Sequence, residues 1–219
     1  MLTRVLVAIN VIVYLCERFV WGLDPTSLAA HGGLVGYDVQ NGEWWRIITS
    51  AFLHGSDMHI IFNMIALFQV GTFVEMIYGT GRMAIMYLLA AIGGGLAVTY
   101  LTPDVVTIGA SGAIFGLFGA LAVAGFRLGP PGRSIMQQTT GIIVINLAIG
   151  LWPGSNISVV DHIGGLIVGT LCGLALYRPR QLVPVAQPGP EYAQRIGPDP
   201  GAVTIEHPPL DAPERDPQH

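Results

Sequence analysis

Six apolar segments dominate the hydrophobic pattern of this chain, and short polar or glycine-rich connections separate them. A helix needs roughly 20 mostly apolar residues to cross the hydrocarbon core of a bilayer, and each segment comes close to that length. The first segment is the least regular, because Glu17 and Arg18 lie near its end. The pattern predicts six membrane-spanning helices, over residues 5–21, 57–78, 83–101, 108–126, 135–152 and 159–177.

The first segment has one competing interpretation. Arg4 precedes its apolar run and small residues follow at 27–29, as in a secretory signal peptide with its cleavage site. The polar stretch between the apolar run and residues 27–29 is too long for such a signal. We therefore favour a spanning helix.

Two stretches lie outside the six segments. Residues 22–56 form a connection that is rich in glycine and tryptophan and is too long for a simple turn. Ten of the 15 prolines lie at or beyond residue 179, mixed with Glu, Asp and Arg, and such a composition cannot bury a core. We therefore expect a membrane domain over residues 1–178 and a disordered, proline-rich cytoplasmic tail over residues 179–219.

Composition favours a membrane protein and excludes two other classes. The chain is 52% hydrophobic and 11% charged, with a mean hydropathy of +0.58, whereas a soluble domain carries about 25% charged residues. A net charge of −4 leaves no basic surface for nucleic acid. Cys16 and Cys172 lie in apolar runs and resemble small buried hydrophobic residues, so no disulfide is indicated.

Arginine sets the predicted orientation, because the chain contains no lysine. Loops on the cytoplasmic side of a membrane carry an excess of basic residues. The side of the bilayer that holds the first residue carries six arginines against two on the other side; the six are Arg4, Arg82, Arg127, Arg133, Arg178 and Arg180. Both termini are therefore expected in the cytoplasm, and the arginine-only basicity is typical of a high-GC bacterium, which makes the membrane the cytoplasmic one.

Four polar side chains inside the predicted spans are candidates for chemistry: His59 and Asn63 in the second, Ser111 in the fourth and His162 in the sixth. Polar groups are costly in a bilayer, so they are functional candidates by default. All three spans begin on the outer side, which places the four side chains at a shared depth of roughly 5–10 Å. They supply a nucleophile, a base and donors for an oxyanion, the set that acyl transfer requires.

Each of the four residues also has a simpler interpretation when taken alone. A serine in a membrane helix usually bonds its own backbone, a lone histidine usually packs or relays protons, and Asn63 could bridge two helices. Their common depth on three helices favours a site over these interpretations.

Two pairs of glycines lie beside the serine and the second histidine. Gly112 and Gly116 form a GxxxG pattern in the fourth span, and Gly165 and Gly169 form another in the sixth. Small residues at this spacing let two helix backbones approach closely. We therefore expect the fourth and sixth spans to pack together and to bring the Ser111 hydroxyl within hydrogen-bond reach of His162.

Together these motifs resemble those of the rhomboid family of intramembrane serine proteases over about residues 44–177. The resemblance rests on Trp45-Arg46, on His54, His59 and Asn63, on Gly71 and Glu75, on Gly109-Ala-Ser111-Gly112, and on His162-Ile-Gly-Gly165 with Gly169. It implies an all-α, polytopic, six-helix membrane bundle. It also implies a serine-type endopeptidase that acts on transmembrane protein substrates in the lipid bilayer, with its active site open to the outer side.

The resemblance also implies roles for individual residues. Ser111 would be the nucleophile and His162 its general base, while His59, Asn63 and the Ser111 backbone N–H would form the oxyanion hole. Phe115 lies where relatives often have a tyrosine that packs against the catalytic imidazole, so the stacking is kept and the hydroxyl is lost. Supporting positions are Gly109, Gly112, Gly116, Gly165, Gly169, Trp45 and Arg46, the last two pinning the outer loop.

Other polar residues receive structural interpretations. Asp161 adjoins His162 but points about 100° away on a helix, so we interpret it as an interfacial or packing residue. His54 is expected to bond within the outer loop, and Glu75 to cap a helix or to pair with Arg82. The sequence carries no metal, nucleotide or cofactor signature.

Two other functions compete with the protease. A catalytically inactive rhomboid-like protein could bind membrane clients, but such proteins usually lack the serine or the histidine, and this chain has both. A small transporter or channel could use the same residues as a relay, but it predicts internal repeats, which the sequence does not show.

Overall fold

The computed structural model describes residues 1–155 and 157–178. The predicted tail, residues 179–219, lies outside the described residues. Within the described residues the fold is helical, and the one pairing of extended backbone is an isolated antiparallel bridge between Leu34 and Thr107. Residues 1–178 form one compact unit.

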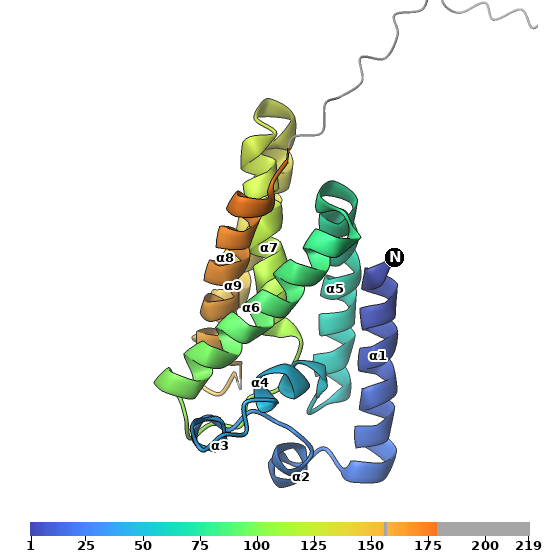
Figure 1. Ribbon diagram of the computed structural model, residues 1–219, viewed down its shortest axis with the longest axis vertical. Coiled ribbons are helices and arrows are strands. Elements are labelled where there is room, and N and C mark those ends of the chain that lie inside the picture. The colour runs from blue at the N-terminus through green and yellow to red at the C-terminus, as the bar shows by residue number, and fades with distance from the viewer. Residues whose placement is uncertain (156, 179–219) are drawn as a thin grey trace, which may run out of the picture. The chain divides into compact units, whose positions relative to one another are not determined.

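Six long helices in the described part of the chain correspond to the six predicted segments. Their bounds are α1 Leu2–Cys16, α5 Asp57–Tyr78, α6 Thr80–Leu101, α7 Ser111–Arg127, α8 Arg133–Gly150 and α9 Val159–Leu176 (Figure 1). The bounds of α5 are the predicted ones, whereas α7 begins three residues later than predicted, because Gly109 has a φ of +117° that a helix cannot contain. Beyond α1, a π-helical turn, Glu17–Trp21, replaces the last predicted α-helical turn.

Length and composition mark several of these helices as membrane-spanning. Among the described residues, α5, α6 and α9 are long and apolar enough to cross a membrane, and α7 is a shorter apolar helix of 17 residues. Large apolar side chains also project from the outside of the bundle; Phe62 is 66% exposed and Phe126 is 69% exposed. Such surfaces suit lipid and not water. The described chain is therefore an all-helical, polytopic membrane bundle.

The long connection between α1 and α5 contains four short helical pieces: α2 Pro25–Ala30, α3 Gly36–Gln40, α4 Arg46–Thr49 and a 3₁₀ turn, Ser50–Phe52. These pieces lie at the end of the bundle where α5, α7 and α9 begin (Figure 1). The bridge between Leu34 and Thr107 and a hydrogen bond from Gly109 N–H to Ser50 O (2.9 Å) join this connection to the segment that leads into α7. The connection therefore supports the starts of the helices that carry the candidate site.

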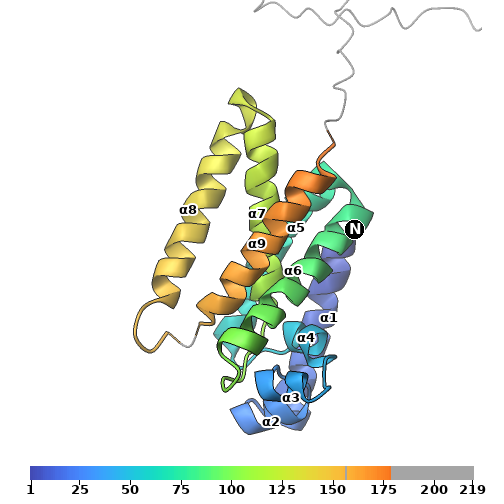
Figure 2. The same cartoon turned by 60° about the vertical axis from the view of Figure 1, so that its left-hand side comes forward.

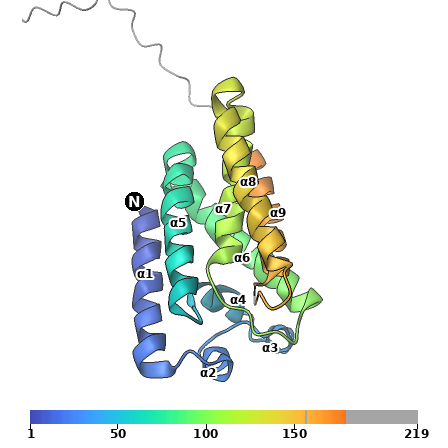
Figure 3. The same cartoon turned by 180° about the vertical axis from the view of Figure 1, so that it is seen from behind.

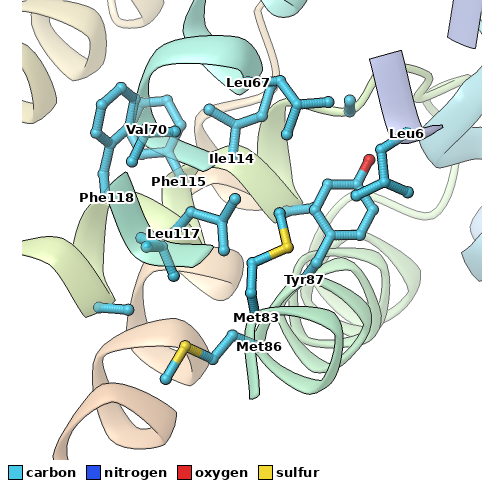
Figure 4. Packing of buried hydrophobic residues seen from close by; sticks show 14 of the residues in the cluster. Leu6, Leu67, Val70, Met83, Met86, Tyr87, Ile114, Phe115, Leu117 and Phe118 are labelled. Carbon is cyan, nitrogen blue, oxygen red and sulfur yellow. The ribbon is translucent and has the colours of Figure 1, made fainter. Parts of the chain in front are cut away.

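Helix α7 is the centre of the bundle. It packs against α5, α6, α8 and α9, and seen from behind it lies between the α1–α5 pair and the α8–α9 side (Figure 3). Its side chains join the main apolar core, in which Ile114 and Leu117 meet Leu67 of α5 and Met83 of α6 (Figure 4). Because α7 begins with Ser111, the candidate nucleophile is carried by the most enclosed helix.

Helices α7 and α9 approach each other backbone to backbone at two levels (Figure 2). A Cβ atom added to Gly165 would collide with the Gly112 carbonyl oxygen, and one added to Gly169 would collide with the Gly116 carbonyl oxygen. The close approach predicted from the two glycine pairs is therefore present.

Glu75, at the other end of α5, caps a helix. Its carboxylate accepts hydrogen bonds from the Leu2 N–H (2.7 Å), the Thr3 N–H (3.1 Å) and the Thr3 hydroxyl (2.8 Å), so it satisfies free N–H groups at the start of α1. Of the two roles expected for Glu75 the structure shows capping, since Arg82 donates instead to the Tyr78 carbonyl.

The glycine contact leads to a stability prediction. Gly169→Ala places a methyl group against the Gly116 backbone, and we expect overpacking to lower the free energy of unfolding by about 1–3 kcal/mol. Gly141→Ala on α8 is the matched control, because nothing lies within 4 Å of its added Cβ; it should raise stability by up to about 1 kcal/mol. Thermal unfolding in detergent measures both, and an equal effect of the two substitutions would contradict the contact.

Candidate active site

His59 and Asn63 lie on one face of the first two turns of α5. Ser56 caps this helix, its hydroxyl accepting the His59 N–H at 3.2 Å. The Asn63 amide nitrogen donates to the His59 carbonyl oxygen at 2.9 Å. The cap and this bond fix the helical turn that carries both side chains.

Ser111 is the first residue of α7 and lies beside His59. Gly109, two residues before it, has a φ of +117°, in the left-handed region that favours glycine. A Cβ atom on Gly109 would lie 2.7 Å from His59 Nε2 and 3.8 Å from Ser111 Oγ. The glycine therefore leaves the space in which the imidazole and the hydroxyl come together.

His162 lies in the first turn of α9 and is 5% exposed. Its ring stacks on Phe115 of α7, with centroids 4.0 Å apart and planes 14° from parallel. Phe115 is one helical turn after Ser111, so the imidazole lies over the face of α7 that carries Ser111. Of the two ring nitrogens, Nδ1 is buried and finds no hydrogen-bond partner among the described residues.

The Ser111 hydroxyl is bonded to Asp161 and not to His162. Ser111 Oγ donates to Asp161 Oδ2 over 3.5 Å, and no Ser111–His162 hydrogen bond occurs within the described residues. Asp161 was expected to point about 100° away from His162 and to be an interfacial or packing residue, and its hydrogen bond to Ser111 goes beyond that expectation. Because α6, α7 and α9 all meet at the start of α9, a side chain about 100° around the helix from His162 still faces the bundle interior.

His54 supports His59 from the outer loop. The two imidazoles meet edge to face, with centroids 5.0 Å apart, and His54 Nδ1 lies 3.3 Å from the Phe52 carbonyl oxygen, so His54 bonds within its loop as expected. Burial, with a smaller contribution from His59, lowers the pKa of His54 to about 3. His54 is therefore neutral at physiological pH.

Glu17, for which no role was expected from the sequence, anchors the same loop. It is fully buried, and its two carboxylate oxygens accept the His54 backbone N–H at 3.0 and 3.1 Å. Tyr14, one turn earlier in α1, donates its hydroxyl to Asp57 at the start of α5 (2.5 Å). The end of α1 thus holds the segment that leads to His59, although α1 carries none of the candidate catalytic groups.

Arg46 joins separate parts of the outer connection by hydrogen bonds. Its guanidinium donates to the Ala29 carbonyl oxygen (2.5 Å), the Gly33 carbonyl oxygen (2.9 Å) and the Glu43 carboxylate (2.7 Å). Trp45 beside it is 46% exposed and packs edge to face against Trp44.

Among the described residues, no three His, Cys, Asp or Glu side chains lie close enough together to hold a metal ion.

Comparisons with known proteins agree with the motifs. A family model described as a rhomboid domain matches residues 41–179. The chain is 38% identical to rhomboid protease GluP of Bacillus subtilis over 81% of its own length and 35% of GluP. It is 33% identical to RHOMBOID-like protein 5 of Arabidopsis thaliana over 73% of its own length and 53% of that protein. Against rhomboid protease AarA of Providencia stuartii it is 30% identical over 80% of its own length and 72% of AarA.

The buried, neutral state of His54 predicts a pH dependence. The pKa of about 3 in the folded protein lies below that of an unfolded histidine, about 6.5. The unfolded state therefore binds more protons below about pH 6.5, and this contribution to stability is lost as the pH falls toward about 3. His54→Gln cannot titrate, so its melting temperature should fall less than that of the wild type between about pH 7 and pH 4. Equal slopes in thermal unfolding would contradict the assignment.

Proposed function

Since this chain belongs to the rhomboid family, we propose that it is an intramembrane serine endopeptidase that hydrolyses a peptide bond in or near the transmembrane segment of membrane-protein substrates. The chain spans 35% of GluP and about half of RHOMBOID-like protein 5, so the proposal concerns the membrane domain. One observation carries it: Ser111, His162 and His59 lie together at the starts of three helices that begin at the same end of the bundle.

The proposed reaction uses Ser111 and His162 as a dyad. Ser111 Oγ attacks the scissile carbonyl carbon while His162 Nε2 accepts the hydroxyl proton. The tetrahedral intermediate collapses by breaking its C–N bond, and His162 returns the proton to the leaving amine. A water then attacks the acyl ester by the same steps in reverse, giving a carboxylic acid and regenerating the Ser111 hydroxyl. For attack, the hydroxyl turns from Asp161 toward His162.

The proposed oxyanion hole comprises His59, Asn63 and the Ser111 backbone N–H. The start of α7 suits negative charge, because its first N–H groups lack partners within the helix and its dipole is positive there. Asn63 donates to the His59 carbonyl oxygen in the free enzyme, so its amide has to turn toward the oxyanion. The stacking of Phe115 on His162 keeps the imidazole plane fixed during both proton transfers.

Membrane placement is part of the proposal. The arginine distribution supports a cytoplasmic membrane with both termini in the cytoplasm and with six spans, which opens the site to the outer side. Substrate would approach beside α8, which packs on α7 and touches α9 at few points. An apolar groove of about 460 Å³ near the end of α8, lined by Ile145, Ile149 and Trp152 among others, suits a lipid-facing helix.

The dyad is tested by cleavage of a single-span substrate in reconstituted vesicles. Ser111→Ala and His162→Ala should abolish cleavage, and Ser111→Ala should also abolish labelling by a fluorophosphonate, because each removes a group that forms or breaks bonds. Ser134→Ala on α8 and His31→Ala on the outer connection, both exposed, are the matched controls and should cut normally. If the wild type does not cut, or if Ser111→Ala cuts equally well, the protein is an inactive client-binding relative or has another function.

The oxyanion hole is tested separately by His59→Ala and Asn63→Ala. Each substitution removes a donor that acts mainly on the transition state, so kcat should fall by about 10²–10³ with little change in KM. Steady-state kinetics on the same substrate measure both constants. A rise in KM at constant kcat would place these side chains in substrate binding instead.

A further inference from the structure

Asp161 occupies the point where α6, α7 and α9 meet, and it is 7% exposed. Its carboxylate fills a space that two glycines leave open, since a Cβ atom on either Gly94 of α6 or Gly112 of α7 would collide with it. A carboxylate enclosed by three helices is costly unless polar groups compensate it. Its partners therefore indicate what it does.

No basic side chain compensates Asp161 in the described part of the chain, where the ion pairs involve Arg18 and Arg46. Its carboxylate accepts the Ser111 hydroxyl over 3.5 Å and lies against the backbone of Gly112. Both belong to the first turn of α7. That helix has no side-chain cap of its own, because Ala110 precedes it. Asp161 thus supplies, from α9, the acceptor that a serine or aspartate usually supplies locally.

The backbone of Asp161 is itself fixed. Ser158 caps α9 and its hydroxyl accepts the Asp161 N–H at 3.3 Å. The side chain therefore ties the first turn of α9, which carries His162, to the first turn of α7, which carries Ser111. The two proposed reacting groups are linked through one residue.

We infer that Asp161 is a positioning residue of the Ser111–His162 pair. It holds the nucleophile's hydroxyl and the first turn of α7 in the substrate-free protein, and it releases the hydroxyl to His162 when substrate binds. The inference rests on the proposed protease function. It adds Asp161 to Ser111 and His162 as a third polar group, although the sequence indicated only an interfacial or packing role for it.

The alternative role is purely structural, in which Asp161 only joins α7 to α9. A control for that role is Thr170, nine residues further along α9, whose hydroxyl lies against Gly119 of α7 and bonds the Leu166 carbonyl oxygen. Thr170→Ala perturbs the same interface about 13 Å from Asp161 along the helix. It contacts none of the proposed catalytic groups.

The experiment compares the full chain with Asp161→Ala, Asp161→Asn and Thr170→Ala in detergent and in vesicles. Four quantities are measured: the melting temperature, the second-order rate constant for fluorophosphonate labelling of Ser111, and both kcat and KM on a single-span substrate. Labelling reports the reactivity of Ser111 per folded molecule without substrate binding, so a purely structural role does not change it.

We expect Asp161→Ala to lower the labelling rate constant and kcat on the order of tenfold, with KM within about twofold, because misplaced reacting groups slow the chemical step. Asp161→Asn keeps an oxygen that can accept the Ser111 hydroxyl, so its rates should stay within about threefold of the wild type. Thr170→Ala should leave both rates unchanged.

Three results would overturn the inference. The first is a lowered melting temperature for Asp161→Ala with an unchanged labelling rate, which would make the residue structural. The second is a folded but unreactive Asp161→Asn, which would make the carboxylate a base. If Asp161→Ala does not fold, Asp161→Ser replaces it in the comparison. The third overturning result is then a labelling rate constant and a kcat of Asp161→Ser that equal those of the wild type. Failure of the proposed function looks different, since the wild type itself would not cut.

Discussion

The backbone contact between α7 and α9 is the constraint on which the other features of this structure depend. Gly112 and Gly116 face Gly165 and Gly169 with no room for a side chain at either level. Such contacts are favourable in a bilayer, where apolar side chains gain little by leaving lipid for one another and close packing provides much of the attraction. Because Ser111 precedes the first glycine pair and His162 precedes the second, the same contact places the candidate reacting groups opposite each other.

The polar groups of the site gather at helix starts for a related reason. A helix start has free N–H groups and a positive dipole end, so it can carry polar side chains and negative charge that the middle of a span cannot. Helices α5, α7 and α9 begin at the same end of the bundle, and Glu17, Arg46 and Asp161 hold that end together by hydrogen bonds to backbone groups or to Ser111. The described residues also form an apolar core, to which α7 contributes many side chains.

Much of the framework could be predicted from the sequence. The apolar pattern located the six long helices, including the bounds of α5, because lipid imposes both length and composition on a span. The glycine pairs predicted which helices approach, and their spacing from Ser111 and His162 placed these residues near one another. Contacts between segments that are distant in the sequence were less predictable. Glu75 caps α1 and does not pair with Arg82, because the start of α1 lies beside it in space.

By itself, the sequence determined the helices, the candidate chemistry and the side of the bundle on which it lies, because these follow from periodicity, composition and spacing along one chain. Only the tertiary structure decided where Asp161 and Glu17 point. The geometry of a single helix predicts that Asp161 points about 100° away from His162. In the structure α6, α7 and α9 meet at this position, and the side chain contacts Ser111. Glu17 accepts the backbone N–H of His54, which lies 37 positions later in the sequence. A carboxylate that several helices enclose takes whichever donors they bring to it, and no local pattern records which donors those are.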